Sequence, residues 1–154
     1  MLRLKEIREK YDLTQREIAK LLNVSKTTYN YYETGERFIP LKRLNDYCNI
    51  FKVSADYVLG FTSHNIIPKE KYHLNKKLIS QRIKDIRTIN NLTQNDLAKI
   101  LNTSQSTISA YENGHNLLLT AFLYELNKKL KISADYVIGR SNNIKVLINT
   151  QQPN

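Results

Sequence analysis

The chain of 154 residues is poor in the residues on which several common kinds of protein depend. It contains a single cysteine, Cys48, so an internal disulfide and a thiolate metal cage are both excluded. With only four glycines, it has no glycine-rich loop of the type that cradles phosphate groups. No apolar run approaches the roughly 18 residues that a membrane span needs, and no signal-peptide pattern is present. These absences predict a soluble, cytoplasmic protein.

Residues that commonly carry catalysis are also too sparse to form a recognisable site. The three histidines, His64, His73 and His115, match no partner spacing for metal binding or for a catalytic triad. The carboxylates fall at predicted helix starts and in predicted ion pairs. We therefore expect no enzymatic activity and no catalytic residue. We also expect no metal, no cofactor and no small-molecule ligand.

Acidic residues are outnumbered, since 24 Lys and Arg stand against 14 Asp and Glu and give a net charge of +10. The excess is spread along the chain, with +3 in residues 1–63, +3 in residues 64–79 and +3 in residues 80–142. Lys145 adds one more positive charge. A basic charge that is distributed in this way suits a long polyanion better than one small acidic substrate.

What the sequence does contain is a repeat. Residues 2–63 align with residues 81–142 at a constant offset of 79, without a gap. Ser-Ala-Asp-Tyr-Val at 54–58, for example, returns at 133–137. A gapless repeat of this length indicates two copies of one small domain. The sequence therefore predicts domain 1 at residues 1–63, a linker at 64–79, domain 2 at 80–142 and a C-terminal tail at 143–154.

Each repeat shows the periodicity and the end signals of a short all-helical domain, and neither shows the alternation of a strand. In repeat 1, Leu4 and Ile7 predict a first helix that ends near Lys10. Thr14 with Glu17 has the capping-box form that starts a second helix. Further helix boundaries are predicted in both copies, most of them at corresponding positions. They are Asn23, Ser25, Gly35, Pro40, Ser54 and Gly60 in repeat 1, and Thr93, Ser104, Gly114, Ser133 and Gly139 in repeat 2.

The connection between the second and third helices, residues 22–25, is the most informative joint. It leaves only a few residues between two well-capped helices, so the helices must cross steeply, as in a helix-turn-helix. Ala19 favours this arrangement because its small side chain lets the two helices approach closely. Lys26, Thr27 and Asn30 give the third helix a polar face that cannot belong to the core.

Each repeat resembles the lambda-repressor-like, XRE-type helix-turn-helix domain, a compact five-helix fold that binds DNA. The matching text in both repeats is Leu-Thr-Gln, Ile/Leu-Ala-Lys, Leu-Asn, Ser, Tyr-Glu, Gly, Ser-Ala-Asp-Tyr-Val and a final Gly. It covers nearly all the chain except the linker and the last dozen residues. The resemblance implies an all-α protein with two tandem five-helix domains joined by a short linker. It also implies double-stranded DNA as the partner.

In this family the third helix lies in the major groove, with its N-terminal residues at the base edges. The resemblance therefore implies recognition helices at 26–34 and 105–113. The implied base-contacting residues are Lys26, Thr27, Asn30 and Tyr31 in repeat 1, and Gln105, Ser106, Ser109 and Ala110 in repeat 2. Lysine can donate to guanine, and asparagine or glutamine can pair with adenine.

The family also uses a glutamine at the start of the second helix to bind a backbone phosphate. The implied phosphate contacts are Gln15, Arg16 and Lys20 in repeat 1, and Gln94, Asn95 and Lys99 in repeat 2. The resemblance further implies ion pairs between the first and third helices, Arg8 with Glu33 and Arg87 with Glu112. We interpret these pairs as structural, since removal of one partner would strand a charge. Tyr29, Tyr32, Ile108 and Tyr111 are predicted to pack inside the domains.

The two copies differ along the exposed face of the third helix, which predicts different half-sites or one weakly reading domain. Repeat 2 has no Lys or Arg on that helix and is the candidate for the weaker reader. Its region 117–123 is more apolar than one helix face needs. Two interpretations stay open for this region: an interface with a second copy or another protein, and a well-buried loop and helix.

The linker permits two arrangements as well. About 15 residues can extend to roughly 50 Å, whereas successive major-groove faces lie about 34 Å apart, so one chain could occupy two half-sites. Ile66, Ile67 and Tyr72 could instead pack the two domains together. In the tail, the run 145–148 could pair, dock or fray.

Together these features favour a sequence-specific DNA-binding transcriptional regulator, with repression as the expected role, from a bacterium, a phage or a mobile element. One alternative is an antitoxin that also represses its own operon. The other is a protein-protein adaptor that uses one helix-turn-helix unit as an interaction module. Duplex binding with a steep salt dependence would favour the regulator over the adaptor.

Overall fold

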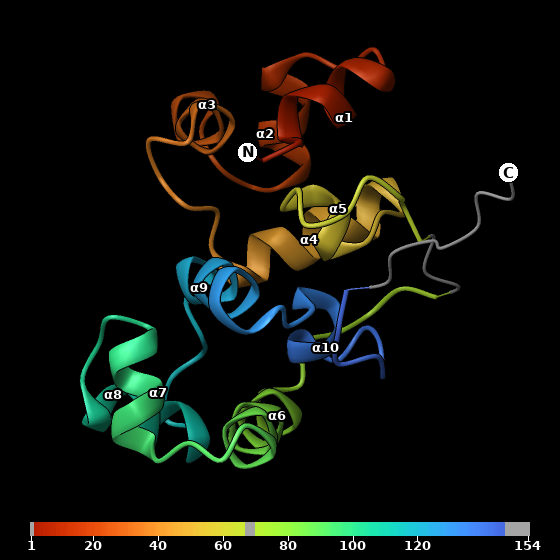
Figure 1. Cartoon of the computed structure of the whole chain (residues 1–154). Helices are drawn as coiled ribbons and strands as arrows, with labels where there is room; N and C mark the ends of the chain where they lie inside the picture. Colours follow the sequence, from red (N-terminus) through yellow and green to blue (C-terminus); the bar gives the residue numbers. More distant parts are fainter. Residues whose placement is uncertain (1, 67–69, 147–154) are drawn as a thin grey trace, which may run out of the picture. The chain divides into compact units, whose positions relative to one another are not determined.

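A computed structural model describes residues 2–66 and 70–146, and within these ranges the chain is all-α, with ten helices and no strand (Figure 1). The chain divides into two compact units, with the boundary in the sequence between Tyr72 and His73, and the described part of each unit contains five helices. The predicted linker is therefore shared, because residues 64–72 belong to domain 1 and residues 73–79 to domain 2. None of the described helices is long and apolar enough to cross a membrane.

Domain 1 has the boundaries that its capping residues predict. The Thr14 side chain accepts a hydrogen bond from the Glu17 backbone, and Glu17 returns one to the Thr14 backbone, which completes a capping box. Gly35 ends the third helix in the left-handed region, at a φ of +79°. The helices are α1 (Leu4–Lys10), α2 (Gln15–Leu21), α3 (Lys26–Thr34), α4 (Leu41–Phe51) and α5 (Ala55–Val58).

Domain 2 repeats this order with three differences at helix ends, one of which is a last helix that runs one residue longer, to Ile138. Its first helix starts at Lys76, inside the segment assigned to the linker, because the Asn75 side chain accepts a hydrogen bond from the Leu78 backbone at 3.0 Å. Its third helix ends at Glu112, one residue before the predicted end, and Asn113 is its C-cap. The helices are α6 (Lys76–Ile89), α7 (Gln94–Ile100), α8 (Gln105–Glu112), α9 (Thr120–Leu130) and α10 (Ala134–Ile138).

Each domain encloses its own core, built from the apolar faces of its five helices. The four residues that we predicted to pack are buried, with exposed fractions of 0% for Tyr29 and Ile108, 6% for Tyr32 and 4% for Tyr111. They are therefore not available for stacking on bases. Full burial of one large apolar side chain stabilises a domain by about 1.5–3 kcal/mol, so these positions hold α3 and α8 against the other helices.

An arginine near the start of each domain fastens the first helix to the end of the domain. In domain 1, Arg3 donates to the carbonyl oxygens of Tyr57 (3.3 Å) and Thr62 (2.5 Å). In domain 2, Arg82 donates to the carbonyl oxygens of Tyr136 and, at 2.6 Å, of Ser141. Because each contact in domain 2 lies 79 residues after its counterpart, the repeat is preserved in long-range hydrogen bonds as well as in helix ends.

The apolar region 117–123 is largely part of the core of domain 2. Leu118 and Leu123 are 2% and 1% exposed, and the Phe122 ring lies 5.6 Å from the Tyr111 ring in an edge-on contact. Leu119 is the exception, with 59% of its side chain exposed. The interpretation as a buried loop and helix therefore accounts for most of this region, and Leu119 alone remains strongly exposed in it.

The first residues of the tail pair with domain 2. Ile132 and Lys145 form an isolated antiparallel bridge, and the Ser133 amide donates to the Ile144 carbonyl at 2.9 Å. Of the three alternatives for the run 145–148, pairing therefore describes Lys145. Residues 147–148 lie outside the described residues, as does Ile67 of the predicted linker.

Candidate nucleic-acid interface

The two helix-turn-helix units are built on the same tight turn. In domain 1, Asn23 has a φ of +52°, and the Val24 amide donates to the Ala19 carbonyl at 2.9 Å. In domain 2, Asn102 has a φ of +51°, and the Thr103 amide donates to the Ala98 carbonyl at the same distance. Asparagine tolerates this left-handed conformation better than most residues, so the sequence fixes the turn locally. In Figure 1, α3 and α8 follow this turn directly.

The first turns of α3 and α8 are accessible. Lys26 and Thr27 are exposed in domain 1, as are Gln105 and Ser106 in domain 2. The base-contact candidates one turn later, which are Asn30, Tyr31, Ser109 and Ala110, are half-buried. Among the phosphate-contact candidates, Arg16, Lys20, Asn95 and Lys99 are exposed, whereas Gln15 and Gln94 are half-buried.

Gln15 links α2 to α3 in domain 1. Its Nε2 group donates to Asn30 Oδ1 at 3.0 Å and to Glu33 Oε2 at 2.8 Å. Both amide hydrogens of Gln15 are thereby used within the domain, which leaves its Oε1 oxygen as an acceptor. The Oδ1 oxygen of Asn30 accepts the hydrogen bond from Gln15, and the NH₂ group of Asn30 is a donor. The resulting surface on α3 is rich in donors, because Lys26 lies on the same helix.

Gln94 makes a different connection in domain 2. Its Nε2 group donates to Glu112 Oε2 at 2.9 Å, and its Oε1 oxygen accepts a hydrogen bond from Gln105 Nε2 at 2.6 Å. Gln105 keeps one N–H and its Oε1 oxygen for an external partner. Domain 2 therefore presents an amide with both a donor and an acceptor, held in place by a neighbouring glutamine.

Both predicted ion pairs are present beneath these glutamines. Arg8 Nε donates to Glu33 Oε1 at 2.5 Å, and Arg87 Nε donates to Glu112 Oε1 at 2.6 Å. The Glu33 and Glu112 side chains are only 4% and 5% exposed. In each carboxylate, burial raises the pKa, but hydrogen bonds from the arginine and the glutamine outweigh burial and hold the pKa below its ordinary value of 4.5. Each pair therefore stays charged, and the pairs fix α3 against α1 and α8 against α6.

One feature of this surface escaped the prediction from sequence. The guanidinium of Arg37 lies over the Tyr31 ring, 4.8 Å from its centroid, and the Arg37 amide donates to the Tyr31 carbonyl at 3.1 Å. In domain 2 the equivalent positions are Asn116 and Ala110, so this stack belongs to domain 1 alone. The aligned repeats contain a sequence signal for this stack, because Arg37 of repeat 1 is replaced by the neutral Asn116 in repeat 2.

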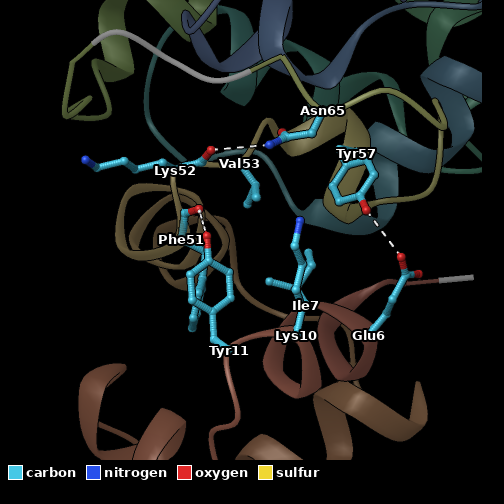
Figure 2. Close-up of a pocket in the computed structure, with 9 residues that line it drawn as sticks. All are labelled: Glu6, Ile7, Lys10, Tyr11, Phe51, Lys52, Val53, Tyr57 and Asn65. Carbon is cyan, nitrogen blue, oxygen red and sulfur yellow. Dashed lines mark hydrogen bonds between the residues drawn. The ribbon is translucent and has the colours of Figure 1, made fainter.

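A pocket of about 220 Å³ lies elsewhere in domain 1, between the ends of α1 and α4 and the start of α5 (Figure 2). Two hydrogen bonds join residues that line the pocket. The Tyr11 hydroxyl donates to the Phe51 carbonyl at 3.1 Å, and the Asn65 amide donates to the Lys52 carbonyl at 3.4 Å. None of the residues predicted to contact DNA lines this pocket. Among the described residues, no group of three or more His, Cys, Asp or Glu side chains could hold a metal ion.

Comparison with known proteins agrees with this geometry. The family model described as Helix-turn-helix matches residues 4–58 and 83–137. The HTH-type transcriptional regulator ImmR of Bacillus subtilis (strain 168) is 31% identical over 128 residues, which cover 82% of this chain and 95% of that protein. The chain belongs to the helix-turn-helix family of DNA-binding transcriptional regulators, with two XRE-type domains in tandem. Its members are non-enzymatic, as the sequence predicts.

Two further relatives match shorter stretches. YobD of Bacillus subtilis (strain 168), an uncharacterised HTH-type transcriptional regulator, is 33% identical over 60 residues, or 39% of this chain and 54% of its own length. The antitoxin PezA of Streptococcus pneumoniae serotype 4 (strain ATCC BAA-334 / TIGR4) is 29% identical over 75 residues, or 49% of this chain and 47% of its own length. No solved structure matches the chain.

Proposed function

We propose that this protein is a sequence-specific transcriptional repressor that binds double-stranded DNA through α3 and α8, each in the major groove of one half-site. The observation that carries the proposal is the pair of exposed polar first turns on α3 and α8, two helices that are each hydrogen-bonded to a glutamine of the preceding helix. Major-groove recognition by a helix-turn-helix uses the N-terminal residues of the second helix in this way.

The proposed half-site of domain 2 contains an adenine opposite Gln105. Adenine presents N7 as an acceptor and the N6 amino group as a donor in the major groove. The free N–H and Oε1 of Gln105 match this pair of groups, and the bond to Gln94 holds the amide in orientation. Ser106 is exposed beside Gln105 and can bond either kind of base, whereas Ala110 can contact a thymine methyl.

The proposed half-site of domain 1 contains guanine instead. Lys26 and the NH₂ group of Asn30 are donors, and guanine offers the two acceptors O6 and N7 on its major-groove edge. Domain 1 also carries Arg37, which is placed by Tyr31 for a phosphate contact. Domain 1 is therefore the stronger reader in this proposal, and domain 2 has no cationic side chain on its recognition helix.

Binding to the phosphate backbone supplies the rest of the affinity. Gln15 and Arg16 begin α2, and Gln94 and Asn95 begin α7, so both positive helix ends face a phosphate in this arrangement. Lys20 and Lys99 lie in the last turns of the same helices and add positive charge to the proposed contact. Occupation of an operator by a protein of this kind blocks access to a promoter, which is why we propose repression. The proposed target places the protein in the cytoplasm.

A second candidate function is that of an antitoxin that represses its own operon. The similarity to the antitoxin PezA favours it. In this case a toxin would be the protein partner. Leu119, which is 59% exposed next to α9, is a contact point for such a partner or for a second copy in an adaptor protein.

Selection of sites from a random duplex library, at near-physiological salt and with the intact protein, tests the proposal. Two different half-sites at a fixed spacing are expected, one with guanine for domain 1 and one with adenine for domain 2. Lys26→Ala with Asn30→Ala should weaken binding by about 1–3 kcal/mol per lost base contact, and Gln105→Ala with Ser106→Ala should cost less. Equal losses would contradict the unequal readers. A failure to enrich any sequence, together with tight self-association, would favour the adaptor.

A further inference from the structure

The segment that follows α5 stays hydrogen-bonded to domain 1. The Ser54 amide donates to Asn65 Oδ1 at 3.0 Å, and Asn65 Nδ2 donates to the Lys52 carbonyl at 3.4 Å. Figure 2 shows the Asn65 amide beside the Lys52 carbonyl, at one side of the pocket. Residue 65 is therefore still fastened to the end of α4, although it lies inside the predicted linker.

A second and stronger attachment follows at Tyr72. Its carbonyl oxygen accepts hydrogen bonds from Asn45 Nδ2 at 3.0 Å and from Asn49 Nδ2 at 2.7 Å. Its amide donates to Asn49 Oδ1 at 3.0 Å. Asn45 and Asn49 lie one turn apart on α4, and Asn45 is only 5% exposed. Both polar groups of the Tyr72 backbone are thus held by two side chains, in what we call the asparagine clamp.

The clamp leaves a short free connection between the domains. Because α6 begins at Lys76, only residues 73–75 lie between the clamped residue and the first helix of domain 2. Four Cα–Cα steps span at most about 14 Å. The next attachment described toward the N-terminus is that of Asn65, and a chain released from Asn65 to Lys76 would span up to about 38 Å in eleven steps.

We propose that Asn45 and Asn49, by clamping Tyr72, determine the spacing between the two half-sites that one chain can bind. This inference rests on the proposed function, because it requires that both α3 and α8 read DNA. With the clamp closed, the short connection restricts how far the two recognition helices separate. With the clamp open, the connection alone exceeds the roughly 34 Å of one helical turn of DNA.

The clamp has no counterpart of the same chemistry in domain 2. The positions on α9 that correspond to Asn45 and Asn49 are Tyr124 and Lys128, and neither has an amide side chain. The scaffold residues of the two repeats agree, whereas these two α4 positions differ. The clamp therefore lies in domain 1, from which the chain continues into domain 2.

The first experiment measures the clamp without DNA. Asn49→Ala removes two of the three hydrogen bonds and is half-exposed, and Tyr72→Pro removes the amide donor without any change in α4. The Tyr72 amide should exchange with solvent at least about tenfold faster in Asn49→Ala, since a 1.4 kcal/mol loss corresponds to that factor. Asn143→Ala, an exposed residue of domain 2, is the matched control and should leave this exchange unchanged.

Domain separation is read in the same proteins from spin labels at Lys5 and Lys129, with Cys48→Ala to remove the native thiol. Both labelled positions are exposed, and Cys48 is fully buried. Asn49→Ala and Tyr72→Pro should broaden the distance distribution toward longer distances, and Asn143→Ala should not. Identical distributions in all four proteins would overturn the inference, because the clamp would then not limit separation.

The second experiment places the two selected half-sites at increasing spacings in otherwise identical duplexes. Wild type should bind one or two adjacent spacings and lose at least tenfold in affinity elsewhere. Both clamp variants should tolerate a window wider by up to about seven base pairs, since the added reach is about 24 Å and each base pair rises about 3.4 Å. An unchanged range of tolerated spacings in the clamp variants would overturn this inference but would leave the proposed function intact. A wild-type protein that selects no half-site would overturn the proposed function as well.

Discussion

Arg8→Met gives the sharpest test of how α3 is held against α1. The change deletes both hydrogen bonds from Arg8 to Glu33, at 2.5 and 3.3 Å, and a third from Arg8 Nη1 to the Leu13 carbonyl at 2.8 Å. Glu33, only 4% exposed, keeps the bond from Gln15 but loses its cation. Removal of one partner from a buried pair costs about 3–5 kcal/mol. A domain of this size has only about 3–9 kcal/mol of stability in total, so most of it should disappear.

The pH dependence of unfolding should also change sign. In wild type the pKa of Glu33 lies below 4.5, so its contribution to stability is present above pH 4.5 and is lost as the pH falls through the folded-state pKa. In Arg8→Met, burial, which is the largest single influence on the pKa of Glu33, raises it, and the guanidinium no longer helps the hydrogen bond from Gln15 to oppose this rise. The folded state then takes up a proton more readily than the unfolded chain, so domain 1 should gain stability as the pH falls from 7.

Urea unfolding followed by NMR separates the two domains, and domain 2 serves as the internal control with its intact Arg87–Glu112 pair. A double variant, Arg8→Met with Glu33→Leu, should recover most of the lost stability, because no charge is then stranded. A cost below about 1 kcal/mol for Arg8→Met, within the range of an exposed ion pair, would refute the reasoning. So would a domain 1 that loses stability on acidification as wild type does.

Three smaller predictions concern single residues. Gly35→Ala and Gly114→Ala both place a side chain at positive φ, which costs about 1–2 kcal/mol, and Gly114→Ala should cost more in thermal unfolding because its Cβ would meet a serine hydroxyl at 3.2 Å. Thr14→Ala removes the cap of α2 and should cost about 1 kcal/mol in urea unfolding, whereas an equal stability would contradict the capping box. Gln94→Ala frees Gln105 and should weaken binding to the adenine half-site, but not to the guanine half-site, in titrations of separate half-sites.

Local signals predicted most of this fold. Thr14 and Ser25 cap their helices by hydrogen bonds to residues three positions later, and Asn23 adopts the left-handed conformation within the turn. Contacts of this kind depend on a few neighbouring residues, so they can be read from the sequence. The ion pair between Arg8 and Glu33 spans 25 residues, and only the family resemblance indicated it.

Long-range polar contacts were harder to predict. The attachment of Tyr72 to α4 joins residues 23 and 27 positions apart through side-chain amides and a backbone, and such a contact leaves no periodic pattern. The early start of α6 was not predicted for a related reason. Asparagine is common in linkers, and the sequence alone does not show that the Asn75 side chain caps this helix. The assignment of individual side chains to bases or phosphates stays a prediction, because it depends on a partner that the sequence only implies.

The arginines that close each domain have a consequence for how this protein arose. Arg3 binds the carbonyl of Thr62, and Arg82 binds that of Ser141, so the first and last residues of each repeat, 2–63 and 81–142, lie close together. A unit built in this way can be duplicated in a gene without disturbing the interior of either copy, because the new chain joins on at one place. It should equally accept circular permutation, in which the old ends are fused and new ones are opened in an exposed loop.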